Sequence, residues 1–285
     1  LDYEPNSFAI QLRKNQSSVL GILVPSVANF FYDSFISAVE QEARKEGYSV
    51  LIMQSGENAA VEAANLKLLK KNRIAGIFVS LTPETTDIEP FFNLQNRKIP
   101  IIFFDRVPEF EACNKICLPD AYAAKIAAEA LIEKNKKHVL AVFGYPSLSI
   151  CKKRSEAFIK TFEELSPSTQ LDIEFLPDNE VKAACIKHLN KHDRPDAIFC
   201  MGDLILIGVM QAIYEKKLHV PHDISVITMS NGFIPALFNP KVTYVETSGY
   251  KLGKLAFSRM VECLSGKSFM QELFIDSFLV EGESL

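Results

Sequence analysis

Two carboxylates and a guanidinium stand at positions where an α/β sheet presents side chains to a ligand. Asp105 and Asp203 closely follow apolar runs typical of buried strands (IIFF and AIFC), and Arg154 follows another (HVLAVF). Carboxylates accept, and a planar guanidinium donates, the hydrogen bonds that hold hydroxyl-bearing ligands. Each position has a simpler alternative, because an Asp there can cap the next helix and an Arg can lie in solvent.

Aromatic and small polar residues extend this set of candidates. Asn29, Phe30 and Phe31 open the first predicted helix, where aromatic rings can stack on a sugar or a base. Phe31 suits the core equally well. Thr247 lies at a later crossover, where its hydroxyl is a further candidate for the ligand. These residue types favour recognition of a small molecule.

Catalysis finds little support in the motifs. The sequence has no G-x-S-x-G elbow, no G-x-x-x-x-G-K-[ST] loop and no G-x-G-x-x-G after the first strand. Asp105 and Asp203, taken as an acid/base pair, would still lack a nucleophile or a metal. His188 and His192 have the i, i+4 spacing of a metal pair, but their stretch KHLNKH is more typical of a solvated face. The sequence therefore predicts no enzyme, no metal site and no cofactor.

The elements that must position these residues alternate along the chain. Apolar runs without polar alternation predict strands buried on both faces, and amphipathic stretches between them predict helices, at the spacing of βα units. The predicted strands are 19–25, 48–54, 74–80, 101–105, 138–143, 171–175, 197–201, 225–229, 242–245 and 273–280. The predicted helices are 31–46, 59–72, 153–164, 180–191, 204–216 and 249–264.

Two such sets of units predict an α/β fold of two doubly wound parallel-sheet lobes with a hinged cleft. The expected boundaries are 1–17 for a hinge or linker, 18–116 with 247–270 for the N-terminal lobe, and 117–246 with 271–285 for the C-terminal lobe. Ligands of open α/β sheets lie outside the carboxyl ends of the strands, so the cleft is the expected binding site.

Composition bounds the class of protein. The 285 residues are 48% hydrophobic and 23% charged with a net charge of −4, which argues against a large nucleic-acid groove in the globular core. No apolar run approaches the ~18 residues that a membrane span needs. Six cysteines without a C-x-x-C pair favour a reducing cytoplasm. Since residue 1 is Leu, the natural protein is expected to extend upstream.

The segment from Tyr3 to Gln16 (YEPNSFAIQLRKNQ) differs from the rest of the chain. Pro5 disfavours a helical Asn6, which can then act as an N-cap, and Ala9 and Leu12 form a short apolar stripe. A helix of about seven residues is marginal in water, because nucleation costs more than so few hydrogen bonds return. Such a segment is suited to fold on binding a partner.

These residues carry a resemblance to a known family. The sequence resembles the LacI/GalR family of bacterial transcriptional regulators over essentially its whole length, and the family's hinge pattern matches Tyr3, Pro5, Asn6, Ala9 and Leu12, with Arg13 next. Further matches follow in the family's order: NFFYDSFISAVEQEARKEGYSVLI, IPIIFFDR, RSEAF, FCMGDLILIGVMQAIYEKKLHVPHDISVI and LVEGESL. Phe30 stands where the family usually has Pro, and Ala157 where it has Gly.

The resemblance implies a periplasmic-binding-protein-like fold of type I, and the effector-binding and dimerisation core of a DNA-binding regulator. It implies a homodimer whose lobe closure is coupled to operator binding, with a helix-turn-helix upstream of Leu1. It also implies a small polar effector such as a sugar or sugar derivative, with Arg154 as the principal anchor and Ser230 and Asn231 nearby. The implied DNA-binding hinge residues are Pro5, Asn6, Ala9, Leu12 and Arg13.

Two departures from the family pattern bear on the effector. Ser230 stands where the family has an acid after its Ile-Ser-Val-Ile strand, and Pro119 stands where an acid opens the crossover helix, just before Asp120. The first departure removes a carboxylate that often fixes ligand hydroxyls or ring nitrogens. We therefore expect a ligand less basic than a purine, and the expectation extends to phosphorylated or acidic sugars.

Two rival classes remain open at this point. A stand-alone sugar-binding receptor of a transport system would need a secretory signal and no hinge, the reverse of what this sequence shows. An α/β enzyme would need a catalytic constellation, which the motifs do not supply.

Overall fold

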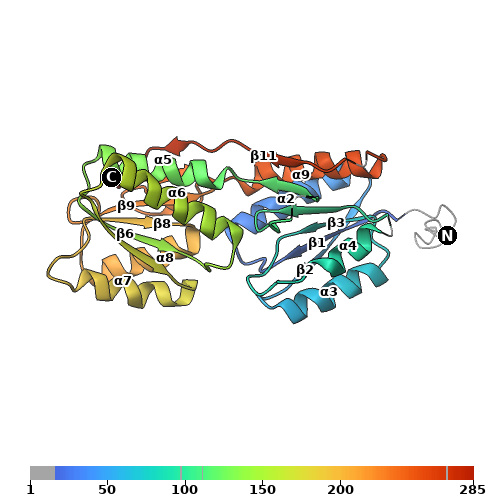
Figure 1. The fold of residues 1–285 in the computed structure, drawn as a ribbon, viewed down its shortest axis with the longest axis horizontal. Helices are drawn as coiled ribbons and strands as arrows, with labels where there is room; N and C mark the ends of the chain where they lie inside the picture. The colour runs from blue at the N-terminus through green and yellow to red at the C-terminus, as the bar shows by residue number, and fades with distance from the viewer. Residues whose placement is uncertain (1–16, 97, 111, 268) are drawn as a thin grey trace, which may run out of the picture. The chain divides into compact units, whose positions relative to one another are not determined.

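The described residues of this computed structural model (17–96, 98–110, 112–267 and 269–285) form two six-stranded sheets with the same strand order (Figure 1). They divide into two compact units. Unit 1 holds residues 17–28, 32–116 and 250–273, and unit 2 holds residues 29–31, 117–249 and 274–285. No helix among the described residues is long and apolar enough to cross a membrane.

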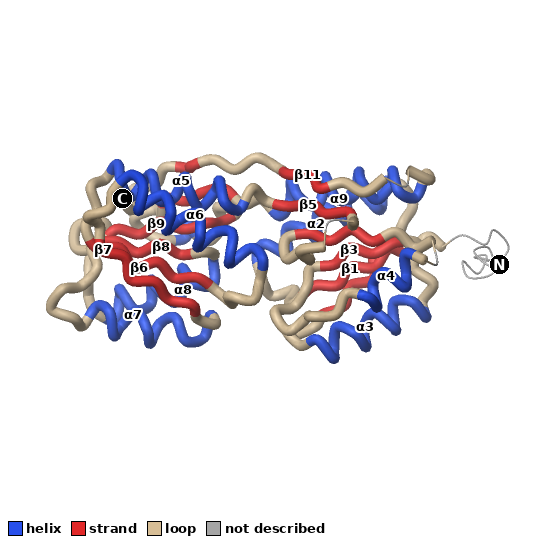
Figure 2. Tube along the Cα trace, in the orientation of Figure 1, coloured by secondary structure: helices blue, strands red, loops and turns tan. Residues whose placement is uncertain are grey.

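The sheet of unit 1 has the order β11-β5-β4-β3-β1-β2. Its strands are β1 (Val19–Val24), β2 (Ser49–Gln54), β3 (Gly76–Val79), β4 (Ile101–Phe104), β5 (Asn114–Cys117) and β11 (Glu272–Phe274). Helices α2 and α9 cover one face, and α3 and α4 cover the other (Figure 2). These helices are α2 (Phe30–Lys45), α3 (Ala59–Lys71), α4 (Glu89–Gln95) and α9 (Gly249–Leu264).

The sheet of unit 2 repeats this plan with the order β12-β10-β9-β8-β6-β7. Its strands are β6 (His138–Phe143), β7 (Gln170–Phe175), β8 (Ala197–Cys200), β9 (Ser225–Ser230), β10 (Thr243–Glu246) and β12 (Leu279–Val280). Helices α5 and α6 lie on one face and α7 and α8 on the other (Figure 2). These helices are α5 (Asp120–Glu133), α6 (Ser149–Leu165), α7 (Val181–Leu189) and α8 (Asp203–Glu215).

Burial explains why the central strands lack polar alternation. Every residue of β3, β4, β6, β8 and β9 is buried, whereas the edge strands β2 and β7 are partly exposed. In each sheet β1 or β6 lies between the next two strands in sequence, and their pairings are parallel. The chain therefore reverses direction along the sheet at these strands, and the connections on the two sides diverge at their carboxyl ends.

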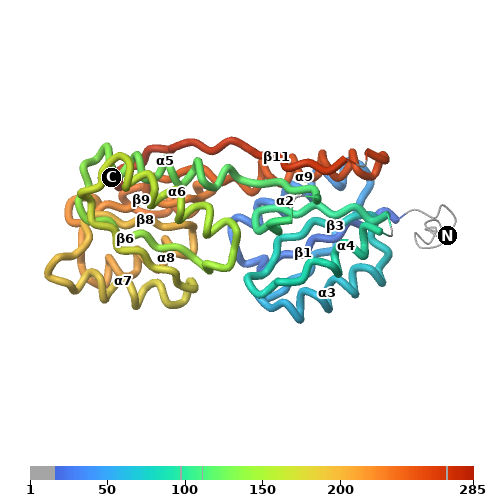
Figure 3. Tube along the Cα trace, in the orientation of Figure 1, coloured from blue at the N-terminus to red at the C-terminus, as the bar shows by residue number. Residues whose placement is uncertain are grey.

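Aromatic packing fixes the helices on the sheets. In unit 1, Phe35 of α2 stacks on Phe104 of β4 with ring centroids 3.6 Å apart. In unit 2, Phe158 of α6 stacks on Phe199 of β8 at 4.5 Å. The helix α9, late in the chain, packs beside the early helix α2 (Figure 3). A Cβ atom at Gly253 would lie 2.7 Å from the carbonyl oxygen of Phe35, so glycine is required for this approach.

Most predicted elements are confirmed, one prediction is wrong, and some elements were not predicted with bounds. The single closing strand 273–280 is wrong, because β11 and β12 are separate short strands in different sheets. The helix α4 and the strand β5 were not predicted, and α5 was expected only as the crossover helix of the family pattern, without bounds. Elsewhere the bounds agree within a few residues, as at β6 and α9.

Candidate functional site

Arg154 forms a buried ion pair with Asp120 near the carboxyl ends of the unit 2 strands. This side chain comes from α6, and only 6% of the residue is exposed. Its Nε atom donates to Asp120 Oδ1 at 2.7 Å, and its Nη2 atom lies 2.7 Å from the same oxygen. Its Nη1 atom donates to the carbonyl oxygen of Met201 at 3.2 Å. The alternative of a solvated Arg154 is therefore wrong, and the charge of the guanidinium is neutralised within the fold.

Asp203 begins α8 beside the end of β9. Gly202 occupies the N-cap position and no side chain caps this helix, so the capping alternative for Asp203 is wrong. The Ser230 hydroxyl donates to Asp203 Oδ1 and accepts from the Gly232 N–H at 3.0 Å. Burial raises the pKa of Asp203 to about 6, although the hydrogen bond from Ser230 acts in the opposite direction. The fold thus holds a carboxylate in a place that disfavours its charge.

Three further candidates lie against the same strand end. The side-chain amide of Asn231 donates to the carbonyl oxygen of Phe30 at 3.2 Å, and the ring of Phe30 lies 5.3 Å from that of Phe233. Thr247 is buried, and its N–H donates to the carbonyl oxygen of Ser230 at 2.7 Å. The structure therefore brings Phe30, Ser230, Asn231 and Thr247 together in unit 2.

The two remaining candidates, Asn29 and Phe31, lie at the start of α2. Asn29 accepts a hydrogen bond from the Phe31 N–H at 2.9 Å, an interaction that orders the first turn. Phe31 itself is half-buried.

In unit 1 a polar network surrounds Asp105, which follows β4 with a φ of 56°. The hydroxyl of Tyr32 donates to Asp105 Oδ2 at 2.9 Å and lies 2.9 Å from the Ser80 hydroxyl. Burial is the largest cause that raises the pKa of Tyr32 well above its ordinary value. No described helix starts directly after Asp105, so its capping alternative is also wrong. Tyr32 and Ser80 were missed because only the tertiary fold brings them to this aspartate.

Replacing Tyr32 by phenylalanine is expected to lower the free energy of unfolding by about 1–3 kcal/mol, because the buried Asp105 carboxylate loses a donor. Urea denaturation measures the loss. Tyr48→Phe is the matched control, since Tyr48 is only half-buried and is expected to change stability by less than about 0.5 kcal/mol. Equal losses in the two variants would contradict the role assigned to Tyr32.

Arg106 follows Asp105 and is held by a second acid. Its Nη1 atom lies 2.6 Å from Glu57 Oε2, and its guanidinium lies 6.0 Å from the centre of the Tyr32 ring. As with Arg154, the positive charge already has a carboxylate partner. Arg106 in unit 1 and Arg154 in unit 2 are therefore both paired with carboxylates.

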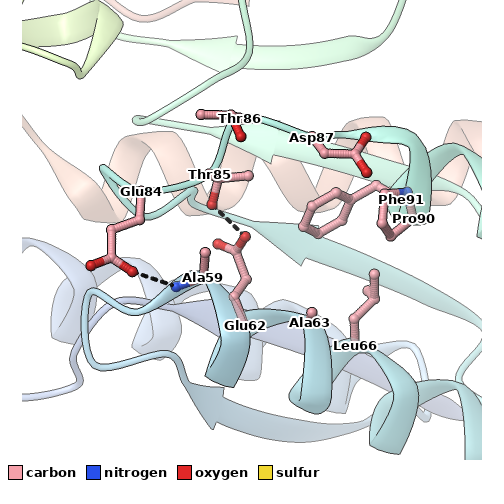
Figure 4. Close-up of a pocket in the computed structure, with 10 residues that line it drawn as sticks. All are labelled: Ala59, Glu62, Ala63, Leu66, Glu84, Thr85, Thr86, Asp87, Pro90 and Phe91. Carbon is pink, nitrogen blue, oxygen red and sulfur yellow. Dashed lines mark hydrogen bonds between the residues drawn. The ribbon is translucent and has the colours of Figure 1, made fainter.

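A cavity of about 190 Å³ lies elsewhere in unit 1, between α3 and the loop that precedes α4 (Figure 4). Glu62 is 2% exposed; its Oε1 accepts from the Thr85 hydroxyl at 2.6 Å and its Oε2 from the Thr82 N–H at 3.1 Å. Glu84 accepts from the Ala59 N–H at 3.1 Å. These carboxylates tie the loop to α3. The cavity is lined by Ala59, Glu62, Ala63, Leu66, Glu84, Thr85, Thr86, Asp87, Pro90 and Phe91.

The two predicted histidines lie in different surroundings, His188 near the end of α7 and His192 in the loop that follows. His188 is buried, with Nδ1 3.0 Å from Asp172 Oδ2 and Nε2 2.8 Å from Glu174 Oε1, so the predicted solvated position is wrong for it. His192 is exposed. Among the described residues no group of three or more His, Cys, Asp or Glu side chains could hold a metal ion.

The predicted hinge falls outside the described residues. This applies to Pro5, Asn6, Ala9, Leu12 and Arg13.

Comparisons with known proteins agree on one kind of relative. Residues 128–285 match the model of the periplasmic binding protein-like domain. The HTH-type transcriptional repressor PurR of Vibrio atlanticus (strain LGP32) is 26% identical over 278 residues, which are 96% of this chain and 83% of the relative.

Solved structures share the fold. The lac repressor dimer bound to operator and the anti-inducer ONPF has a TM-score of 0.86 at 21% identity and covers 99% of both chains. A periplasmic binding protein/LacI transcriptional regulator from Alkaliphilus metalliredigens QYMF, complexed with D-xylulofuranose, has a TM-score of 0.83 at 21% identity, covering 94% of this chain and 99% of that one. The predicted two-lobed fold class is confirmed. The relatives are repressors rather than enzymes, which confirms the prediction of a non-enzyme.

Proposed function

Since the chain belongs to the periplasmic binding protein-like family, in its LacI/GalR branch, we propose that it is the effector-binding and dimerisation region of a DNA-binding transcriptional regulator. The observation that carries this proposal is the span of the similarity. Repressor relatives match 96% of the chain and not only the domain at residues 128–285. Both lobes of the chain are therefore similar to those of a repressor.

The proposed effector is a small polar metabolite, a sugar or sugar derivative. Its binding residues are proposed at the carboxyl ends of the strands, where donors and acceptors for hydroxyl groups are held in place by the fold. One of the similar solved structures contains a sugar, D-xylulofuranose, which supports this class. The proposed set is Asn29, Phe30, Phe31, Asp105, Arg154, Asp203, Ser230, Asn231 and Thr247.

Operator DNA and a second copy of the chain are the proposed macromolecular partners. The hinge residues from Pro5 to Arg13 are proposed to bind DNA together with a helix-turn-helix, and the protein is proposed to act in the cytoplasm. A dimer presents two identical hinges to a palindromic operator. The exposed side chains of Phe233 and Leu237, 55% and 66% accessible, lie in a loop that a second copy is proposed to cover.

A stand-alone sugar-binding receptor of a transport system is the second candidate. The fold alone suits it equally, because such receptors share the two-lobed architecture. The hinge motif and the repressor relatives favour the regulator. Sequence-specific DNA binding by the whole gene product distinguishes the two.

Calorimetric titration with sugars, sugar phosphates, sugar acids and purines tests the ligand assignment. One site per chain is expected, and Arg154→Lys is expected to weaken binding about tenfold or more. Lysine keeps the ion pair with Asp120 but loses the planar fork of donors. The matched control is Arg194→Lys, an exposed arginine of unit 2. Equal affinity in both variants would show that the site is misassigned, and binding of purines alone would show that the ligand class is wrong.

A further inference from the structure

We infer that the unit 2 part of the effector site selects uncharged, hydroxyl-bearing ligands and rejects phosphorylated and acidic sugars, with Asp203 as the deciding residue. This inference rests on the proposed function and deepens it. It also departs from the expectation, drawn from the sequence, that phosphorylated or acidic sugars would fit.

The guanidinium of Arg154 is already paired within the fold. Arg154 directs Nε and Nη2 at one oxygen of Asp120 and Nη1 at the carbonyl oxygen of Met201. Asp120 is itself buried, 4% exposed, so its charge is not screened by solvent. An anionic ligand would therefore compete with a carboxylate that the fold already holds against the guanidinium. Arg154 can still donate to a hydroxyl, but it offers no uncompensated charge.

The side-chain donors near Asp203 already bond groups of the protein. The Ser230 hydroxyl donates to Asp203, and the Asn231 amide donates to the carbonyl oxygen of Phe30. The N–H groups of Gly232 and Thr247 donate to Ser230. Each of these donors already bonds a protein acceptor. A phosphate or carboxylate, which only accepts when ionised, would depend on the second N–H of Asn231 and on the uncapped N–H groups at the start of α8, which lie beside the Asp203 charge.

The Asp203 carboxylate keeps an acceptor for a ligand. Within the described part of the chain, Ser230 is the one hydrogen-bond partner that the structure gives the Asp203 carboxylate. Its second oxygen is thus available to a ligand that brings its own donor, as a sugar hydroxyl does. Among these three residues Arg154 and Asp120 compensate each other, and Asp203 leaves one negative charge in excess. A second anion placed near it is repelled.

Ser230 is what allows this arrangement. An acid at this position, as the family pattern has it, would place two carboxylates within hydrogen-bond distance of each other. The serine hydroxyl instead donates to Asp203 and keeps a single carboxylate there. The departure from the family therefore leaves Asp203 as the single carboxylate of this pair.

The test compares matched pairs at pH 7.5 and constant ionic strength: D-ribose with D-ribose 5-phosphate, D-glucose with D-glucose 6-phosphate, and D-xylulose with D-xylulose 5-phosphate. Inorganic phosphate is titrated separately while the Arg154 Nε–H resonance is followed by NMR. For any pair that binds, the free sugar is expected to bind at least tenfold more tightly than its ester. Phosphate is expected to give no saturable shift below about 10 mM.

Asp203→Asn is expected to tighten binding of inorganic phosphate at least tenfold, because it removes the repelling charge and adds an amide donor. Glu215→Gln is the matched control: it removes one negative charge from the last residue of the same helix, about 18 Å away, and is expected to change nothing. Saturable phosphate binding by the wild type, an ester that binds more tightly than its sugar, or equal phosphate affinity in both variants would overturn the inference. If no sugar binds, the sugar class fails while the phosphate titrations still decide this inference.

Discussion

Replacing Asp120 by alanine is expected to lower the free energy of unfolding by about 3–5 kcal/mol, because the buried guanidinium of Arg154 loses its counter-charge. Asp120 and Arg154 are 4% and 6% exposed, and two guanidinium nitrogens lie 2.7 Å from one carboxylate oxygen. The hydrogen bond to Met201 cannot compensate, since a carbonyl carries no net charge. Urea denaturation at pH 7.5 measures the effect.

The double variant Asp120→Ala with Arg154→Met separates an unpaired charge from a general packing defect. It is expected to recover most of the loss, because no buried charge remains. Glu164→Ala on the same helix as Arg154 is the control; this acid is exposed, pairs with Lys160 at 3.7 Å and is expected to matter by less than about 1 kcal/mol. A double variant no more stable than Asp120→Ala would contradict this account of the pair.

Replacing Asp203 by asparagine is expected to stabilise the protein at pH 7.5 by about 2–3 kcal/mol. Burial raises the pKa of this carboxyl from 3.8 to about 6, and each tenfold increase in proton affinity corresponds to roughly 1.4 kcal/mol. The folded chain keeps its proton more readily than the unfolded chain. Stability contributed at Asp203 is therefore present below about pH 4 and is lost as the pH rises to about 6. Asparagine has the same shape and can still accept from Ser230.

The measurement is urea denaturation of wild type and Asp203→Asn at pH 4 and at pH 7.5. The variant is expected to be more stable at the higher pH only, and the two proteins are expected to agree within about 0.5 kcal/mol at the lower one. Glu215→Gln is again the control, with no expected difference at either pH beyond that of an exposed ion pair. A variant less stable than wild type at pH 7.5 would contradict the assigned cost of the buried charge.

The expected increase in the free energy of unfolding of Asp203→Asn also bears on the function of Asp203. A residue that lowers stability where it stands, yet lies at the carboxyl ends of the strands, has the profile of a binding group and not of a structural one. Asp203 is thus distinguished by its place in the fold as well as by its charge.

The fold was predictable from sequence where burial dictates the pattern. The strand β6 and the helix α9 were predicted with the bounds they have, because one is apolar throughout and the other has a clear apolar face. The closing segment 273–280 was predicted wrongly, because its apolar residues are typical of a buried strand. Phe274 and Phe278 are in fact 54% and 46% exposed. Solvent exposure of aromatic side chains cannot be inferred from residue type.

The site was predictable only in part. Asp105, Arg154 and Asp203 were found because strand ends are visible in the sequence. Their partners were not, since Asp120 lies 34 positions from Arg154 and Tyr32 lies 73 positions from Asp105. Asp120 lies directly after Pro119, the position where the family pattern has its acid. An aspartate in the first turn of the crossover helix was the signal that could have identified the counter-charge.

The central claim is that this chain couples a small polar effector to DNA binding, and the DNA affinity of the whole gene product with and without sugar tests it most directly. Genomic fragments retained by the immobilised protein supply the DNA, and fluorescence anisotropy measures its dissociation constant. A saturating sugar from the calorimetric panel is expected to change this constant about 5- to 150-fold, in either direction. A constant that is the same with and without the bound sugar, or the absence of any sequence-specific DNA, would contradict the account.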